Sequence, residues 1–259
     1  MTNSCNKEKK FHGYLDMRQK GMWRNTTALF SLFKPADLEL YRSLLRPPLE
    51  MPETPAVAIF MFDYHDVKPT GAVPYLEYAY CLRCKYLGKE GWHILTMPVN
   101  RFVPLIGIFL GFPKYIASEM MMSPTDINDG WSVLVKHEDQ LKMSLEFTPG
   151  LTRKLDTFEK NAIHGSAFDL DEPLYGFIPP NTGLFFNRVM VEDVVESKWE
   201  RKKLGMAKAR IGSSEPFSGL IAPDAEGVCA LMRYHGGCIL VDRTLGFYWN
   251  SKNARSENT

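Results

Sequence analysis

Charge of one sign, long apolar runs and cysteine are all scarce in this sequence, and each shortage excludes a class of protein. The 31 Lys and Arg residues are balanced by 30 Asp and Glu residues, so a nucleic-acid partner is not expected. The longest uncharged apolar run, residues 102–113, is broken by Pro104, Gly107 and Gly111 and falls short of the ~20 residues that cross a bilayer. No membrane partner is therefore expected. Because the cysteines are few and odd in number and the N-terminus lacks the apolar stretch of a secretory signal, we expect a cytoplasmic protein.

The common catalytic and metal-binding motifs are also missing. The sequence contains no Gly-x-Ser-x-Gly elbow, no Walker loop, no dinucleotide fingerprint after a strand and no His-Glu-x-x-His. Cys81 and Cys84 have the spacing of a metal-binding pair, but no second pair follows, and a strand would direct the two thiols to opposite faces. We predict two buried thiols there, no metal site and no cofactor.

What is present predicts a mostly β fold of the α+β class. Apolar residues make up 45% of the chain, which is enough for a full core. One short helix is expected at 35–45, where Pro35 stands at a first-turn position. Strands are expected at 56–62, 75–86, 141–147, 183–191, 227–232 and 238–241. We predict a curled or closed sheet with a few short peripheral helices, forming a single domain over residues 14–250 between disordered tails at 1–13 and 251–259.

Two charged residues stand out from this apolar pattern. Lys114 follows about a dozen apolar or small residues. Desolvation disfavours an ammonium group, so a lysine carried into such surroundings presents a nucleophilic amine, whereas a lysine at a strand end can instead extend to water. Glu77 lies on one face of the strand expected at 75–86, together with Arg83, which could pair with its carboxylate. Both residues are candidates for chemistry.

The segment Gly-Phe-Pro-Lys-Tyr-Ile-Ala at 111–117 resembles the Gly-Phe-Pro-Lys-Lys segment of the acetoacetate decarboxylase-like superfamily. Four other segments occur in the family's order and approximate spacing: Arg-Pro-Pro-Leu-Glu at 46–50, His-Asp at 65–66, Tyr-Leu-Glu at 75–77 and Phe-Ile-Pro-Pro-Asn-Thr-Gly at 177–183. The resemblance covers residues 24–248. It implies a cone-shaped antiparallel β-barrel with small helices around it, usually assembled as a homo-oligomer.

The same match suggests roles for individual residues. Lys114 matches the Schiff-base lysine and Glu77 matches the active-site glutamate of the family. Tyr115 stands where acetoacetate decarboxylases carry a second lysine, so activation of Lys114 would depend on removing its amine from water. By distant analogy with aldolase-dehydratases of the superfamily, Tyr248 is a candidate proton donor.

Four positions are expected to bind the substrate. Thr27 falls near the family's substrate-binding arginine, and Phe60 falls where the family carries a further glutamate. Loss of those two charged groups favours a substrate that is bulkier and more apolar than acetoacetate. The expected substrate-binding residues are Thr27, Phe60, Phe112 and Tyr115.

Three functions remain open at this point. In the first, a lysine Schiff base catalyses decarboxylation of a small-molecule β-keto acid bulkier than acetoacetate. In the second, an aldolase-dehydratase condenses a 2-oxo acid such as pyruvate with an aldehyde. Both use an iminium that withdraws electrons from the reacting carbon. In the third, the barrel is not catalytic and binds an apolar ligand. The first is the prediction, and the other two are its alternatives.

Overall fold

The computed structural model describes residues 15–16, 21–68, 74–102, 112–126, 129–164, 172–178, 186–197, 201–233 and 238–249. The tails expected at 1–13 and 251–259 lie outside these residues. The strands are β1 Leu15–Asp16, β2 Gly21–Phe33, β3 Val57–Lys68, β4 Tyr75–Tyr86, β5 Lys89–Val99, β6 Lys114–Ile116, β7 Glu119–Pro124, β8 Trp131–His137, β9 Gln140–Pro149, β10 Leu174–Ile178, β11 Phe186–Ser197, β12 Arg201–Ile211, β13 Ala225–Arg233 and β14 Cys238–Trp249. The helices are α1 Leu38–Leu44, α2 Thr157–His164 and the 3₁₀ turn η3 Ser218–Leu220.

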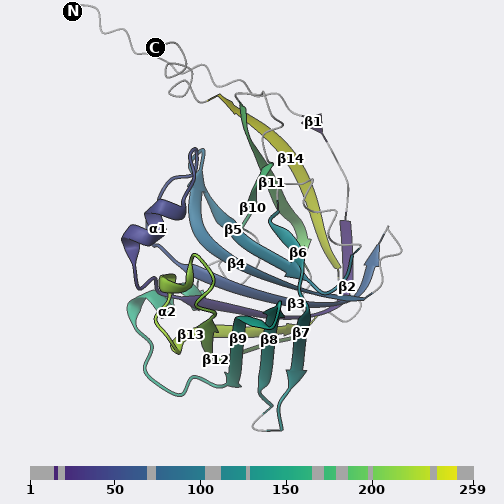
Figure 1. Ribbon diagram of the computed structural model, residues 1–259, viewed down its shortest axis with the longest axis vertical. Helices are drawn as coiled ribbons and strands as arrows, with labels where there is room; N and C mark the ends of the chain where they lie inside the picture. Colours follow the sequence, from purple (N-terminus) through teal and green to yellow (C-terminus); the bar gives the residue numbers. More distant parts are fainter. Residues whose placement is uncertain are drawn as a thin grey trace, which may run out of the picture.

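All of these strands belong to one sheet, in the order β1-β14-β11-β10-β5-β4-β3-β2-β13-β12-β9-β8-β7, with β6 paired to β5. β14 pairs with β11 and also, through residues 238–241, with β2. The sheet curls strongly into a half-barrel, with β11 and β14 on one side of the curl and β7, β8 and β9 on the other (Figure 1). The predicted mostly β fold with a few helices is therefore confirmed.

Two pairings depart from the predicted antiparallel arrangement. β10 runs parallel to β5 at residues 174–175, and β6 runs parallel to β5 along its whole length. Parallel neighbours cannot be joined by a tight hairpin and need a longer connection. β6 and β10 are both joined to β5 by more than a tight turn. Residue alternation along a strand does not show in which direction its neighbour runs, so the sequence could not predict these two parallel pairings.

The helix expected at 35–45 forms over Leu38–Leu44, and its first turn explains the difference. Asp37 is the N-cap, and its Oδ1 accepts hydrogen bonds from the backbone N–H groups of Glu39 and Leu40 at 2.9 Å each. Pro35 therefore precedes the helix instead of occupying its first turn. None of the helices in the described residues has the length and apolar composition needed to span a membrane.

The sheet separates two packed layers of side chains. We call the first the Phe60 face, which carries Phe30, Phe60, Phe62, Ala79, Trp92 and Val99. We call the second the Ile59 face, which carries Leu29, Ile59, Tyr78, Tyr80, Trp131 and Leu231. Because strand residues alternate between faces, the neighbours Ile59 and Phe60 enter different cores.

The two cysteines of the Cys-x-x-Cys spacing also lie in different clusters. Cys81 packs on the Phe60 face and Cys84 packs with Tyr86 and Tyr175, and both thiols are fully buried. Burial raises the pKa of both thiols. The prediction of two buried thiols is confirmed, and their separate clusters agree with side chains that point away from each other.

His93 gives the fold a pH dependence that can be measured. It is buried on β5, and burial lowers its pKa from 6.5 to about 4. Because the unfolded chain binds this proton more readily, the stability from a neutral His93 is complete above pH 6.5 and is lost as the pH falls toward 4. We expect this group to lower the free energy of unfolding by about 2–3 kcal/mol between pH 7.5 and pH 4.5, measured by urea denaturation. In His93→Gln, whose amide does not titrate, the drop should shrink by that amount; an equal drop in both proteins would contradict the assignment.

Candidate active site

Among the described residues, the ion pair with the least exposed partners joins Lys114 and Glu77. Lys114 Nζ donates a hydrogen bond to Glu77 Oε2, and the two side chains are 8% and 7% exposed. Glu77 lies on β4 and Lys114 begins β6, and β5 runs between them: Glu77 is opposite Val99, and Lys114 is opposite Met97. A sheet pairing thus brings together two side chains that are 37 positions apart in the sequence.

Backbone hydrogen bonds fix the base of the Lys114 side chain on β5. Met97 N donates to Pro113 O at 3.0 Å, and Ala117 N donates to Val99 O at 3.0 Å. These bonds hold the chain on both sides of Lys114. The position of the amine is therefore set by the sheet and not by a loop, which is the arrangement that keeps a reactive group within a narrow range of geometry.

The surroundings of the pair are apolar. Glu77 is directly opposite Phe62 as well as Val99, and Phe112, two residues before Lys114, is 5% exposed. Burying a charge is costly unless a partner of opposite charge accompanies it, and the ion pair gives each of the two side chains such a partner. With 8% of its side chain exposed, Lys114 does not extend into water.

Glu77 pairs with Lys114 and not with Arg83. The Arg83 guanidinium instead binds two other carboxylates, Glu90 at 2.9 Å and Glu172 at 2.5 Å. Transfer of one proton from the Lys114 ammonium to the Glu77 carboxylate would leave a neutral amine beside a carboxylic acid. The first is a nucleophile and the second is a proton donor, which together are what imine formation requires.

Aromatic side chains line the same face of the sheet. Phe60, which is 2% exposed, stacks on Phe30 with ring centroids 4.2 Å apart. Trp92 meets both rings edge-on, at 6.0 Å from Phe30 and 5.9 Å from Phe60, and Phe62 lies 6.1 Å from Phe60. We call Phe30, Phe60, Phe62 and Trp92 the aromatic wall. It carries no formal charge.

The structure places four of the expected site residues together and two apart. The Phe60 face carries Phe60 and Phe112 in its core cluster, and it also carries the ion pair of Lys114 with Glu77. Tyr115 points to the opposite face, where its hydroxyl is hydrogen-bonded to Thr96 and its ring centroid lies 4.9 Å from that of His137. Burial raises the pKa of Tyr115 to about 12.

Thr27 also lies away from the ion pair. Alternation along β2 places it with Leu29 on the Ile59 face, whereas its neighbour Thr26, which is 1% exposed, falls with Ala28 on the Phe60 face. Thr26 thus places a buried hydroxyl on the same face of the sheet as the ion pair. It is not among the predicted site residues, although the alternation of Thr26, Ala28 and Phe30 along β2 indicates that the three share a face. Tyr248 is paired with Asn187 through the backbone of β14, and its side chain lies outside the described residues.

Within the described part of the chain, no group of three His, Cys, Asp or Glu side chains is arranged to hold a metal ion. The chemistry that the geometry supports in these residues is that of an amine and a carboxyl group.

Comparison with known proteins identifies the same family that the sequence resembles. The model of the acetoacetate decarboxylase family matches residues 15–223. No curated protein matches the sequence. Among solved structures, the chain is similar to acetoacetate decarboxylase from Legionella pneumophila, with 17% identity, a TM-score of 0.69 and 88% of each chain covered.

It is also similar to the enduracididine biosynthesis enzyme MppR. A structure of MppR with bound HEPES has 16% identity and a TM-score of 0.66 over 87% of each chain. A second MppR structure, in complex with the condensation product of pyruvate and imidazole 4-carboxaldehyde, has 16% identity and a TM-score of 0.64 over 85% of this chain and 87% of that one. At these identities the likeness is one of fold.

Proposed function

Because this chain belongs to the acetoacetate decarboxylase family, we propose that it is a lyase in which Lys114 forms a Schiff base with a small keto acid. The observation that carries the proposal is the buried pair of Lys114 Nζ and Glu77 Oε2 on the sheet. The predicted cytoplasmic location, the homo-oligomer and the single domain over 14–250 remain predictions.

The reaction starts with proton transfer from the Lys114 ammonium to the Glu77 carboxylate. The neutral amine attacks the ketone carbon, and the carbinolamine loses its hydroxyl as water, taking a proton back from the Glu77 carboxylic acid. The product is a protonated imine. In a β-keto acid, the electrons of the bond to the carboxylate then move toward the iminium nitrogen, which releases CO2 and leaves an enamine. Protonation at carbon and hydrolysis of the imine release the ketone and regenerate Lys114.

We propose further that the substrate is bulkier and more apolar than acetoacetate. The aromatic wall supports this, because its four uncharged rings offer surfaces for stacking, and the Arg83 guanidinium beside Trp92 is already paired with Glu90 and Glu172. An aryl or long alkyl group on the ketone carbon would contact these rings. The carboxylate of the keto acid would leave as CO2, so the aromatic wall would not have to bind a charged group in the product.

An aldolase-dehydratase reaction is the alternative, and the likeness to MppR favours it. That enzyme has been crystallised with pyruvate and with a condensation product of pyruvate and an aldehyde. An enamine formed from pyruvate at Lys114 would attack the aldehyde carbon, and loss of water would give a conjugated product. CO2 would not be released.

The two reactions are separated by measuring CO2 release and ultraviolet absorbance in parallel. We expect CO2 from benzoylacetate with a kcat/KM at least about tenfold above that for acetoacetate, after subtraction of the spontaneous rate. In Phe60→Leu, which removes one ring of the aromatic wall, the preference for benzoylacetate should fall by about fivefold to tenfold. A conjugated chromophore from pyruvate and benzaldehyde without CO2 would establish the alternative. If none of these substrates gives CO2 or a chromophore, the non-catalytic, ligand-binding function is favoured.

A further inference from the structure

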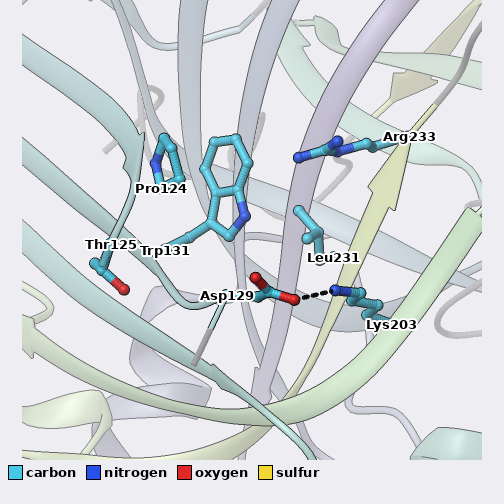
Figure 2. Close-up of a pocket in the computed structure, with 7 residues that line it drawn as sticks. All are labelled: Pro124, Thr125, Asp129, Trp131, Lys203, Leu231 and Arg233. Carbon is cyan, nitrogen blue, oxygen red and sulfur yellow. Dashed lines mark hydrogen bonds and ion pairs between the residues drawn. The ribbon is translucent and has the colours of Figure 1, made fainter. Parts of the chain in front are cut away.

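A pocket of about 250 Å³ opens on the Ile59 face, where the ends of two strand pairs meet. Its apolar lining comes from one end of β7 and β8 and from β13, and its charged lining comes from the β7–β8 turn, β12 and β13. The residues that matter here are Pro124, Trp131, Leu231, Asp129, Lys203 and Arg233. Figure 2 shows Trp131 in the middle of the pocket, with Pro124 on one side and Leu231 and Arg233 on the other.

Strand register builds this pocket. Trp131 is opposite Pro124 across β7 and β8, and Leu231 is opposite Lys203 across β12 and β13. Arg233 follows Leu231 by two positions, so both side chains lie on the same face of β13. Leu231 and Trp131 belong to the Ile59 core cluster, whereas the Lys114–Glu77 pair lies on the Phe60 face. The pocket is therefore separate from the candidate active site.

Among the described residues, Arg233 is the pocket cation that forms no ion pair. Its guanidinium carbon lies over the Trp131 ring, 5.5 Å from the ring centroid, which holds the side chain in place. Its Nε is buried and has no hydrogen-bond partner, and no carboxylate of the described residues forms an ion pair with it. A buried N–H without an acceptor is costly, and a ligand oxygen would satisfy it.

The other two charges in the pocket neutralise each other. Lys203 Nζ lies 3.0 Å from Asp129 Oδ2, as the dashed line in Figure 2 marks. The three charged side chains thus leave a net charge of +1, which matches a monoanion. A phosphate dianion would meet the Asp129 carboxylate with only one free guanidinium to compensate, whereas a carboxylate fits the planar fork of a single arginine.

We propose that this pocket binds a small monocarboxylate with an apolar body, its carboxylate on Arg233 and its body against Trp131, Leu231 and Pro124. This site is independent of the proposed Schiff-base chemistry. It uses residues from three parts of the chain, at 124–125 and 129–131, at 203, and at 231–233, which the curled sheet brings together.

Isothermal titration of the full chain with benzoate tests the proposal. We expect a dissociation constant of about 1 mM or tighter, and a weakening of about tenfold or more in Arg233→Met, whose thioether can still pack on Trp131. Asp129→Asn should tighten benzoate binding by about twofold to fivefold, because it removes the competing carboxylate. Asp129 has a φ of 56°, and asparagine tolerates this left-handed backbone well, so the fold should be kept.

Three controls make the test decisive. Lys114→Met/Glu77→Gln, which leaves no unpaired charge buried at the other site, should bind benzoate as the unmodified chain does, and loss of binding in this folded variant would move the carboxylate to the other site and overturn the proposal. Benzamide or inorganic phosphate binding as tightly as benzoate would overturn the monocarboxylate assignment. If Arg233→Met melts early, Arg233→Lys keeps the charge without the planar fork, and unchanged benzoate affinity in that variant would also overturn the proposal.

Discussion

Replacing Lys114 with alanine is expected to abolish the borohydride-dependent mass increase that the protein shows with its keto-acid substrate. Borohydride reduces a protonated imine to a stable secondary amine, so the adduct records Schiff-base formation directly. With a β-keto acid, the mass increase should equal the mass of the product ketone less one oxygen atom, because CO2 leaves before or during trapping, imine formation expels water and borohydride adds two hydrogens. Turnover should fall on the order of 10⁴-fold or more, since the covalent nucleophile is gone. Intact mass, peptide mapping and CO2 release measure these effects.

Lys136→Ala is the matched control for this experiment. Lys136 also forms an ion pair with a glutamate, Glu119, but both side chains are well exposed, at 37% and 41%. An exposed surface pair of this kind is not part of the buried site, so this variant should keep both the adduct and the turnover. An adduct that persists in Lys114→Ala, or that maps to another lysine, would contradict the proposed role of Lys114.

The strands of the site could be predicted from sequence because their alternation is long and regular. The strand expected at 75–86 forms over the same residues, and it places Glu77 with Ala79 and Cys81 on one face. The same alternation separates Tyr115 from Lys114 on β6. Period-2 patterning thus predicts which residues share a face, and it does so from neighbours in the chain alone.

The partner of Lys114 could not be derived in this way. Lys114 meets Glu77 because β6 runs parallel to β5 and β5 runs antiparallel to β4, and neither direction leaves a mark in the alternation of residues. A one-residue shift in either pairing would have sent Glu77 or Lys114 to the other face. The family resemblance suggested both residues, and the register of three strands explains why they are neighbours.

The same limit applies to positions assigned through the family. Thr27 stands near a family position that binds substrate, yet it lies on the Ile59 face, and Thr26 occupies the Phe60 face. A match that is approximate by one residue is sufficient to reverse the face of a strand residue. The aromatic wall was only partly predicted for a related reason. Phe30 and Trp92 join Phe60 through pairings across β2, β3 and β5, which the sequence does not specify.

Breaking the buried ion pair on one side should destabilise the fold strongly, and removing both charges should restore most of the loss. In Lys114→Met, the Glu77 carboxylate remains in apolar surroundings without its partner, so we expect the free energy of unfolding to fall by about 3–5 kcal/mol. Glu77→Gln leaves the ammonium with one amide oxygen to bind, and it should cost less, at about 1–3 kcal/mol. Urea denaturation at pH 7.5 measures each loss.

The double variant Lys114→Met/Glu77→Gln distinguishes a functional pair from a structural one. With both charges gone, no unpaired charge is buried, and we expect stability within about 1–2 kcal/mol of the unmodified protein, well short of the sum of the two single losses. The double variant should nevertheless form no borohydride adduct, because it has no amine at the site. Additive losses in the double variant would mean that the two groups do not interact. A double variant as stable as the unmodified protein but without turnover would show that the fold does not need this pair, and that its burial serves the chemistry of Lys114.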